Sequence, residues 1–446
     1  MHPANQRIRR RIPRTDQTPA PAAGESEDCL NLNVFTPASA SSTGSKAVLV
    51  WFYGGGFVYG ATSVPLYDGT SFAANQDLVV VTVNYRTNVF GFPADSKIPV
   101  KERNVGLLDQ RLALDWVHRN IAKLGGDPSK VTLVGESAGG SSVDALVVSP
   151  PHPVPFRAAI MESGQSTIKT PLDADPKTYT KSWKSLVHLA KCPSDDDAVE
   201  CLRKLPARDL KHLVEKNSLA FGPVSDGGHT WAETPQLARQ LSTDKISSIA
   251  RVPVLIGSNA DEDKPFAIGQ NDTRKFLASN GIRGVYADML LKAYPLGSPG
   301  AHTENDRISL IATDAFMHCP AQKYANLSAG VGIPTWRYFF NASFPNNEIF
   351  KGSGAYHSAE IQFVFGTYPQ AKATPFERDV GRVMQTAWAD FAKDPVKGPG
   401  WKQDPQVAVF GDGVKAGMSA EGRNALRVVD SGFMDRRCRL YQELYR

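Results

Sequence analysis

Residues 131–141 read Val-Thr-Leu-Val-Gly-Glu-Ser-Ala-Gly-Gly-Ser, and this stretch decides the expected fold. Its first four residues are β-branched or apolar, as in a buried parallel strand. A Gly-x-Ser-x-Gly sequence follows at once, and residues 142–146 are able to open a helix. Between a strand and a helix, this sequence predicts a nucleophile elbow, a turn so tight that only glycine fits two residues before and after the serine. Ser137 is therefore the candidate nucleophile.

An elbow serine needs a base to take its proton, and the base needs an acid to orient it. On such an elbow, the acid and then the histidine follow the serine along the chain. Open α/β sheets build their sites beyond the carboxyl ends of the strands. The apolar run 252–257 predicts a strand of this kind, and three carboxylates follow it, Asp261, Glu262 and Asp263. The residues alone leave all three as candidates for the acid.

Three histidines lie downstream of these carboxylates. His318 stands in a helix-like stretch beside apolar residues, which is typical of a packed core position. His302 lies in a loop rich in Gly, Pro and Asn, where a solvated surface position is expected. His357 lies in a loop of small residues that leads into the apolar run 361–365. This setting makes His357 the best candidate for the base.

A second glycine sequence, Gly54-Gly55-Gly56, follows the apolar run 47–53, which predicts an early buried strand. Without side chains, successive backbone N–H groups are able to point at one spot, where a carbonyl oxygen becomes an oxyanion. The N–H of Ala138, directly after the nucleophile, would complete this hole. A phosphate-binding turn is the alternative, but the sequence lacks the Lys-Ser/Thr of a P-loop and the spacing of a dinucleotide site.

Strand-like and helix-like segments alternate along the rest of the chain. Further strands are predicted at residues 30–35, 78–83, 156–161 and 335–340, and amphipathic helices at residues 106–122 and 379–393. Residues 170–245 are charged, helical in pattern and interrupted by prolines, which predicts a helical lateral insertion. The alternation favours an α/β protein with a mostly parallel sheet. We expect one domain over residues 25–446, preceded by a disordered basic arm at residues 1–24.

The composition, with 41% hydrophobic, 9% aromatic and 21% charged residues, is that of a globular protein with a large core. The 446-residue chain has a net charge of only +5, with acids and bases interspersed, which argues against nucleic-acid binding. The arginine-rich arm leaves nucleic-acid binding as an alternative for that segment alone. No apolar run approaches the roughly 20 residues of a transmembrane helix.

Five cysteines are too few for a disulfide scaffold in a chain of this length. Cys192 and Cys201 flank a short acidic loop, which suits a local disulfide, and no second Cys or His pair has the spacing of a zinc site. Three Asn-x-Ser/Thr sequons, at Asn271, Asn326 and Asn341, matter only in a secreted protein. These features favour an extracellular location, although the N-terminal arm lacks the apolar core of a signal peptide. A cytoplasmic protein stays an alternative, as does a chain that lacks its true beginning.

Several other motifs are spread over the chain. They are Ser-Glu-Asp-Cys-Leu-Asn-Leu-Asn-Val at 26–34, Asn84-Tyr85-Arg86, Asn-Val-Gly-Leu-Leu-Asp-Gln at 104–110, Leu-Asp-Trp-Val at 114–117, Gly-Gly-Asp-Pro at 125–128 and Glu162-Ser163-Gly164. With the elbow and the glycine loop, they resemble the type-B carboxylesterase/lipase family, which includes cholinesterases and fungal extracellular lipases. The resemblance runs from about Glu25 to the C-terminus and is to a fungal-type member shortened at its N-terminus. It implies an α/β-hydrolase fold, with helices on both faces of the sheet, and ester hydrolysis as the activity.

The resemblance also assigns roles to single residues. It implies the nucleophile Ser137, the acid Glu262, the base His357, the oxyanion donors Gly55, Gly56 and Ala138, and the charge-tuning residues Glu136 and Ser163. The family's acid loop usually reads Asp/Asn-Glu-Gly, whereas Asp263 stands at the glycine position here. Asp261 therefore stays an alternative to Glu262. The family's His-Gly pair is His357-Ser358 in this chain.

By the same resemblance, Cys192–Cys201 and Cys319–Cys438 are expected disulfides. Cys29 is expected to be unpaired, because its family partner belongs to a segment that this chain lacks. The implied chemistry needs no metal or organic cofactor, and the expected partner is a small-molecule or lipid ester. Acyl and alcohol specificity and oligomeric state stay open. The alternatives are a non-catalytic cholinesterase-like adhesion or binding protein, and a truncated esterase without an assembled site.

Overall fold

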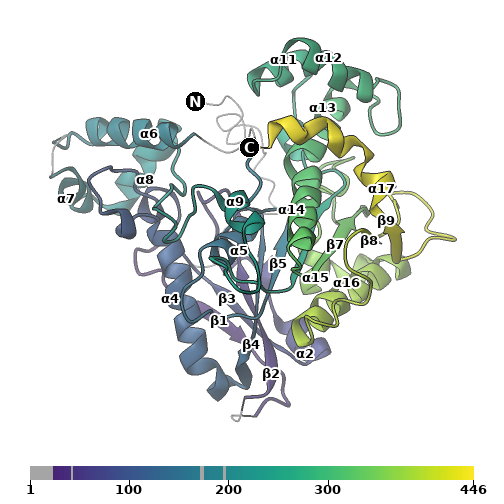
Figure 1. The fold of residues 1–446 in the computed structure, drawn as a ribbon, viewed down its shortest axis with the longest axis horizontal. Coiled ribbons are helices and arrows are strands. Elements are labelled where there is room, and N and C mark those ends of the chain that lie inside the picture. Colours follow the sequence, from purple (N-terminus) through teal and green to yellow (C-terminus); the bar gives the residue numbers. More distant parts are fainter. Residues whose placement is uncertain (1–23, 42–43, 171–174, 194–196, 446) are drawn as a thin grey trace.

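The structure of the protein is a computed structural model (Figure 1), which describes residues 24–41, 44–170, 175–193 and 197–445. All but Gly24 of the arm predicted at residues 1–24 lies outside the described residues. Within the described residues, nine strands form one sheet in the order β1-β3-β2-β4-β5-β6-β7-β8-β9. The two outermost strands run antiparallel to their neighbours and the others run parallel. This arrangement confirms the predicted α/β class with a mostly parallel sheet.

The strands are β1 (Leu32–Phe35), β2 (Lys46–Phe52), β3 (Val79–Val83), β4 (Gly126–Glu136), β5 (Ala158–Glu162), β6 (Val254–Asn259), β7 (Thr335–Phe340), β8 (Gln406–Phe410) and β9 (Leu426–Asp430). Strands β1 to β7 lie where apolar or alternating runs predict them, whereas the sequence analysis does not predict β8 and β9. Strand β4 begins at Gly126 rather than Val131, because Gly126 already pairs with Lys46 of β2 across a shift in register.

Alternate residues of the central strands are buried on opposite faces of the sheet. In β2, Val50 and Phe52 belong to the core on one face, while Leu49 and Trp51 belong to the core on the other. Because both faces are covered, these strands are apolar throughout, as buried parallel strands are. The parallel strands end at the same edge of the sheet, and the loops beyond that edge carry the candidate residues.

Helices cover both faces of the sheet (Figure 1). On one face lie α4 (Val105–Asn120), α5 (Ala138–Val148) and α14 (Cys319–Gly330), and on the other lie α2 (Thr70–Gln76), α15 (Ile361–Phe365) and α16 (Pro375–Lys393). Helix α16 begins before the predicted residue 379, because Thr374 and Glu377 form a capping box around its first turn. The other α-helices that the structure describes outside the insertion are α3 (Asn88–Gly91), α10 (Lys264–Ala267), α11 (Thr273–Ser279), α12 (Gly284–Ala293), α13 (Glu304–Thr313) and α17 (Ser431–Met434).

The predicted insertion at residues 170–245 is divided between two parts of the molecule. Helices α6 (Pro176–Leu189), α7 (Ala198–Arg203) and α8 (Ala207–Lys216) extend to one side of the sheet (Figure 1) and share a small core with Val89 of α3 and Leu107 of α4. The predicted disulfide Cys192–Cys201 closes this part. Helix α9 (Pro235–Gln240) instead packs against α5 and α14. It belongs to the main body, because its buried Arg239 pairs with Asp144 of α5 at 3.3 Å.

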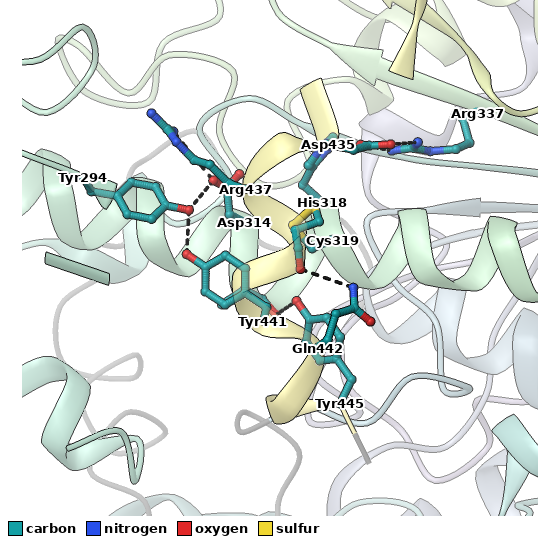
Figure 2. The surroundings of a disulfide bond; sticks show 12 residues. Tyr294, Asp314, His318, Cys319, Arg337, Asp435, Arg437, Tyr441, Gln442 and Tyr445 are labelled. Atoms are coloured by element: carbon teal, nitrogen blue, oxygen red, sulfur yellow. Dashed lines mark hydrogen bonds and ion pairs between the residues drawn. A yellow bond between two sulfur atoms is a disulfide. The ribbon is translucent and has the colours of Figure 1, made fainter. Parts of the chain in front are cut away.

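The C-terminal 3₁₀-helical segment Asp435–Leu444 is attached to the body by a disulfide and a polar network (Figure 2). The predicted disulfide Cys319–Cys438 joins residues 119 positions apart. Tyr441 donates a hydrogen bond to the hydroxyl of Tyr294 at 2.6 Å, and Tyr294 donates to Asp314 at 2.5 Å. The segment is thereby tied to a π-helical turn at residues 314–318, directly before α14.

The expectation that His318 is a packed core residue is confirmed. His318 is buried in the core, with its Nε2 atom 3.0 Å from Asp435, and Arg337 holds the same carboxylate (Figure 2). His318, Asp435 and Cys438 form a compact group, but the sulfur of Cys438 is in the disulfide, so the group is a structural ion cluster.

Cys29 is half-buried and unpaired. Among the helices that the structure describes, none has the length and apolar composition needed to cross a bilayer.

Candidate active site

Ser137 occupies the sharp turn between β4 and α5. Its backbone has φ 55° and ψ −121°, a conformation that is strained for a residue with a side chain. The flanking glycines make this turn sterically feasible. A Cβ atom on Gly139 would overlap the carbonyl oxygen of Phe52, and one on Gly135 would overlap the backbone of Gly139. The sequence prediction of an elbow is thus matched by its local geometry.

The half-buried Ser137 lines an open cleft of about 3500 Å³ at the carboxyl edge of the sheet. His357 lines the same cleft, whereas His302 is exposed in a loop and His318 binds Asp435. Among the described residues, no hydrogen bond engages the hydroxyl of Ser137, including none from His357. The hydroxyl is therefore open to the cleft.

A buried carboxylate lies directly behind the imidazole of His357. The Nδ1 atom of His357 lies 2.6 Å from Oε2 of Glu262, which is completely buried. The other oxygen of Glu262 accepts hydrogen bonds from the hydroxyl of Ser163 and the backbone N–H of Asn259, both at 2.6 Å. These contacts from β6 and the end of β5 fix the carboxylate and, through it, the orientation of the ring.

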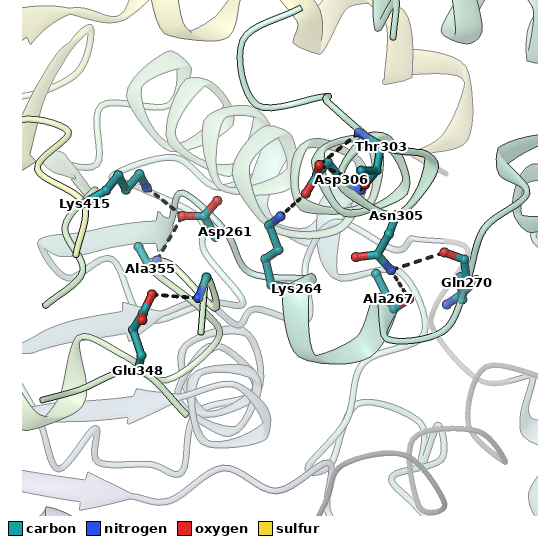
Figure 3. A network of polar contacts seen from close by, with 11 residues as sticks. Asp261, Lys264, Ala267, Gln270, Thr303, Asn305, Asp306, Glu348, Ala355 and Lys415 are labelled. Atoms are coloured by element: carbon teal, nitrogen blue, oxygen red, sulfur yellow. Dashed lines mark hydrogen bonds and ion pairs between the residues drawn. The ribbon is translucent and has the colours of Figure 1, made fainter. Parts of the chain in front are cut away.

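Asp261, the alternative acid, has other partners than the imidazole, and Figure 3 shows them. Its carboxylate accepts hydrogen bonds from the backbone N–H of Ala355 at 2.9 Å and from Lys415 at 2.7 Å. It thus anchors the loop that carries His357, while its neighbour Glu262 contacts the ring. The two adjacent carboxylates therefore have different partners.

On its other side, the imidazole faces a second carboxylate. The Nε2 atom of His357 lies 3.2 Å from Oε1 of Glu136, and the same oxygen accepts a hydrogen bond from Ser358 at 2.6 Å. Burial lowers the pKa of His357, but the charges of Glu136 and Glu262 outweigh burial and raise this pKa to about 10. Burial also raises the pKa of Glu136, against the opposing effects of His357 and Ser358.

Two further buried acids lie near His357 and Glu136, and the sequence analysis assigned a role to neither, although Glu162 stands in the Glu162-Ser163-Gly164 motif. Glu162 accepts a hydrogen bond from Trp388 at 2.6 Å, yet burial raises its pKa to about 8. Glu360 accepts a hydrogen bond from the side chain of Asn259, and burial together with the nearby acids raises its pKa well above the usual value. The available signal was an acidic residue at the edge of an apolar run, three residues after His357 for Glu360 and at the end of β5 for Glu162.

Three backbone amides border the cleft beside Ser137. The N–H groups of Gly55, Gly56 and Ala138 donate to no acceptor among the described residues. Tyr53, directly before the glycine loop, is fixed by Tyr85. The centroids of the two rings lie 4.4 Å apart, and the hydroxyl of each tyrosine donates a hydrogen bond to the backbone carbonyl of the other at 2.7 Å. Unpaired N–H donors on a loop that is fixed in this way are suited to stabilise an oxyanion by hydrogen bonds.

The chain is similar to known proteins over most of its length. The family model described as "Carboxylesterase family" matches residues 4–408. Secreted lipase 5 of Gibberella zeae is 32% identical over 408 residues, which are 85% of this chain and 70% of the lipase. Cholinesterase of Mus musculus is 32% identical over 84% of this chain and 65% of its own length. Para-nitrobenzyl esterase of Bacillus subtilis is 34% identical over 83% of this chain and 74% of the esterase.

Proposed function

The chain belongs to the carboxylesterase family and is a serine hydrolase of carboxylic esters, and we propose that Ser137, His357 and Glu262 are its nucleophile, base and acid. One observation carries this proposal. The completely buried carboxylate of Glu262 lies 2.6 Å from Nδ1 of His357, and His357 borders the same cleft as Ser137. The backbone of Ser137 is strained, and its hydroxyl has no hydrogen-bond partner among the described residues. Glu262 would keep the proton on Nδ1, so that Nε2 is able to accept the proton of Ser137.

The reaction would proceed through an acyl-enzyme. His357 takes the proton of Ser137 as its oxygen attacks the ester carbonyl, and the N–H groups of Gly55, Gly56 and Ala138 stabilise the oxyanion. His357 then protonates the leaving alcohol, and water cleaves the acyl-enzyme through the same groups. The hydrogen bond from the hydroxyl of Ser137 to Nε2 of His357 would form when substrate binds, because hydrogen bonds between catalytic groups are often long or misaligned in the free enzyme.

Glu136 and Ser163 would support this machinery without touching the ester. Ser163 holds Glu262 in place, as its 2.6 Å hydrogen bond indicates. Glu136 stabilises the imidazolium that forms during the reaction, because its carboxylate lies 3.2 Å from Nε2. We further propose a small-molecule or lipid ester as substrate and an extracellular location. A secreted lipase is among the similar proteins, and disulfides persist mainly in oxidising compartments.

Covalent labelling tests the proposed function directly. A fluorophosphonate should react with the native protein once, and peptide mass mapping should locate the adduct on Ser137. Heat-denatured protein is the control and should stay unlabelled, because a serine reacts in this way only when its base and oxyanion donors are assembled. Absence of labelling in the native protein would favour a non-catalytic binding protein or an unassembled site. A label on another residue would remove Ser137 from the mechanism.

The pH dependence of the reaction should depend on Glu136. Since only the neutral imidazole is able to act as base, kcat/KM should rise as His357 loses its proton, with a midpoint well above the ordinary histidine pKa near 6.5. Glu136→Gln removes the charge that raises this pKa, so the midpoint should move to lower pH by at least about one unit. The measurement is a pH profile of kcat/KM on a neutral ester. The exposed Glu421→Gln serves as the charge-matched control, and equal midpoints in both variants would contradict the role of Glu136.

A further inference from the structure

Asp263 is a buried acid for which the proposed mechanism has no use. It follows Glu262 in the loop beyond β6 and lines the cleft, with 6% of its surface exposed. Neither of its carboxylate oxygens accepts a hydrogen bond from the described residues, and Oδ2 is fully enclosed without a partner. Buried polar atoms in folded proteins nearly always have partners, so this carboxyl group needs an explanation.

The surrounding residues do not supply a partner. Among the described residues, the hydrogen bonds of Asp263 come from its backbone: its N–H donates to the hydroxyl of Thr313 on α13 at 3.3 Å, and its carbonyl accepts from the N–H of Ala267 at 2.8 Å. The next residue, Lys264, pairs with Asp306 of α13 (Figure 3). The nearby lining of the cleft from α10 and α13 is apolar, with Phe266 and Ala312. A carboxyl group in such a wall is unsatisfied until a molecule in the cleft brings a donor to Oδ1, the oxygen that is not fully enclosed.

The position of Asp263 relates it to the leaving group of the ester. The ring of Phe266, in the same turn of chain, lies 5.5 Å from the imidazole of His357. The leaving alcohol must pass within hydrogen-bonding reach of that imidazole to receive its proton. The alcohol part of a bound ester would therefore extend along the wall that contains Phe266 and Asp263.

We propose that Asp263 is a substrate-binding residue that accepts a hydrogen bond from a hydroxyl or ammonium group on the alcohol part of the ester. This inference rests on the proposed ester hydrolysis and names the substrate class of the same site. A donor on the alcohol would satisfy the buried carboxyl group, whereas an alkyl group there would leave it unpaired. A site built in this way rejects an analogue that lacks the donor.

The preference for an ester with a hydrogen-bond donor should depend on whether Asp263 is protonated. Burial and the charge of Glu262 raise the pKa of Asp263 to about 7, against the opposing effect of His357. These two groups are the titratable neighbours that act on it, while α13 presents the uncharged Thr313, and Lys264 and Asp306 are paired with each other. A carboxylate is the stronger acceptor, so preference for a donor-bearing ester should increase as pH rises through about 7.

Matched pairs of butanoate esters test the inference. One arm compares hydroxyalkyl esters of graded chain length with alkyl esters that have methyl in place of hydroxyl. The other arm compares dimethylaminoethyl butanoate, which is protonated, with isopentyl butanoate. The measured quantity is the ratio of the two kcat/KM values within each pair, and the rates are obtained by titrating the acid that hydrolysis releases. Because the ratio is taken within one enzyme, a general loss of activity cancels. The best pair should favour the donor roughly tenfold to a hundredfold in the wild type.

Variants at position 263 separate charge from hydrogen bonding. In Asp263→Leu, the ratios should fall to about one in both arms, whereas Asp263→Asn keeps an acceptor oxygen and should lose the ammonium preference more than the hydroxyl preference. Asp261→Asn, in the same loop, should keep the wild-type ratios. Fluorophosphonate labelling at the wild-type rate checks that the Leu variant still assembles its site.

Two outcomes would overturn the inference. The first is a wild type that shows no donor preference in any pair, and the second is a preference that survives Asp263→Leu. Both leave ester hydrolysis intact, because the esters are still cleaved. A protein that cleaves none of the esters and resists labelling would instead remove the proposed function, and this inference with it.

Discussion

Replacing Ser137 by alanine is expected to lower kcat for ester hydrolysis about 10⁴- to 10⁶-fold. The hydroxyl of Ser137 is the only proposed site of the covalent bond, so its removal abolishes the acyl-enzyme route. The oxyanion amides and the cleft would remain and support only slow attack by water. Initial rates on a short-chain aryl ester, with pre-steady-state release of the phenol, measure both the loss of turnover and the loss of the acylation burst.

Ser141 supplies the matched control for this substitution. It lies one turn further along α5 and also lines the cleft, but its hydroxyl donates to the carbonyl of Gln165 at 3.2 Å. Ser141→Ala should therefore keep most of the activity and the burst. Equal losses in the two variants would point to damage to α5, and full activity in Ser137→Ala would exclude this serine as nucleophile.

Replacing Glu262 by glutamine is expected to lower kcat about 10⁴-fold. Glutamine has nearly the same shape and is able to keep the hydrogen bonds from Ser163 and Asn259. It has no charge to stabilise the imidazolium, and its amide N–H₂ group, if turned to the ring, would favour the wrong tautomer of His357. Single-turnover rates at the optimum pH of each variant separate this effect on chemistry from a shift in the pH profile.

Asp261→Asn is the neighbouring control. Its carboxylate pairs with the partly exposed Lys415, and such surface pairs contribute at most about 1 kcal/mol to stability. This variant should retain activity close to that of the wild type. If instead Asp261→Asn lost 10⁴-fold and Glu262→Gln did not, the acid would have been assigned to the wrong residue of the pair.

The nucleophile turn was predictable because its signal is local. Strand, glycines, serine and helix are consecutive, and a side chain on Gly135 would already overlap the backbone of Gly139 within the same turn. The choice between Asp261 and Glu262 was different, because it depends on partners that are distant in the sequence. Lys415, 154 positions away, donates a hydrogen bond to Asp261, and Ser163, 99 positions away, donates one to Glu262. Only the assembled fold brings these partners together.

The missed elements have equally physical causes. Strand β9 is short and largely exposed, so it lacks the apolar alternation that marks a half-buried strand. The sequence analysis assigned no role to the buried acids Glu162 and Glu360, since burial of a carboxyl group depends on what packs over it. For Glu162, one of those contacts is Trp388 from α16, which is 226 positions away. Sequence patterns report local period and composition, and they carry no record of such distant neighbours.

The Cys319–Cys438 bond bears on how the enzyme should be produced. A crosslink across 119 positions lowers the entropy of the unfolded chain by an amount worth about 4–5 kcal/mol. The turn directly before Cys319 contributes Phe316 and Met317 to the cleft wall. Enzyme harvested from a reducing cytosol would therefore have a looser wall as well as lower stability. Thiol quantification of each batch should precede any comparison of substrate preferences between laboratories.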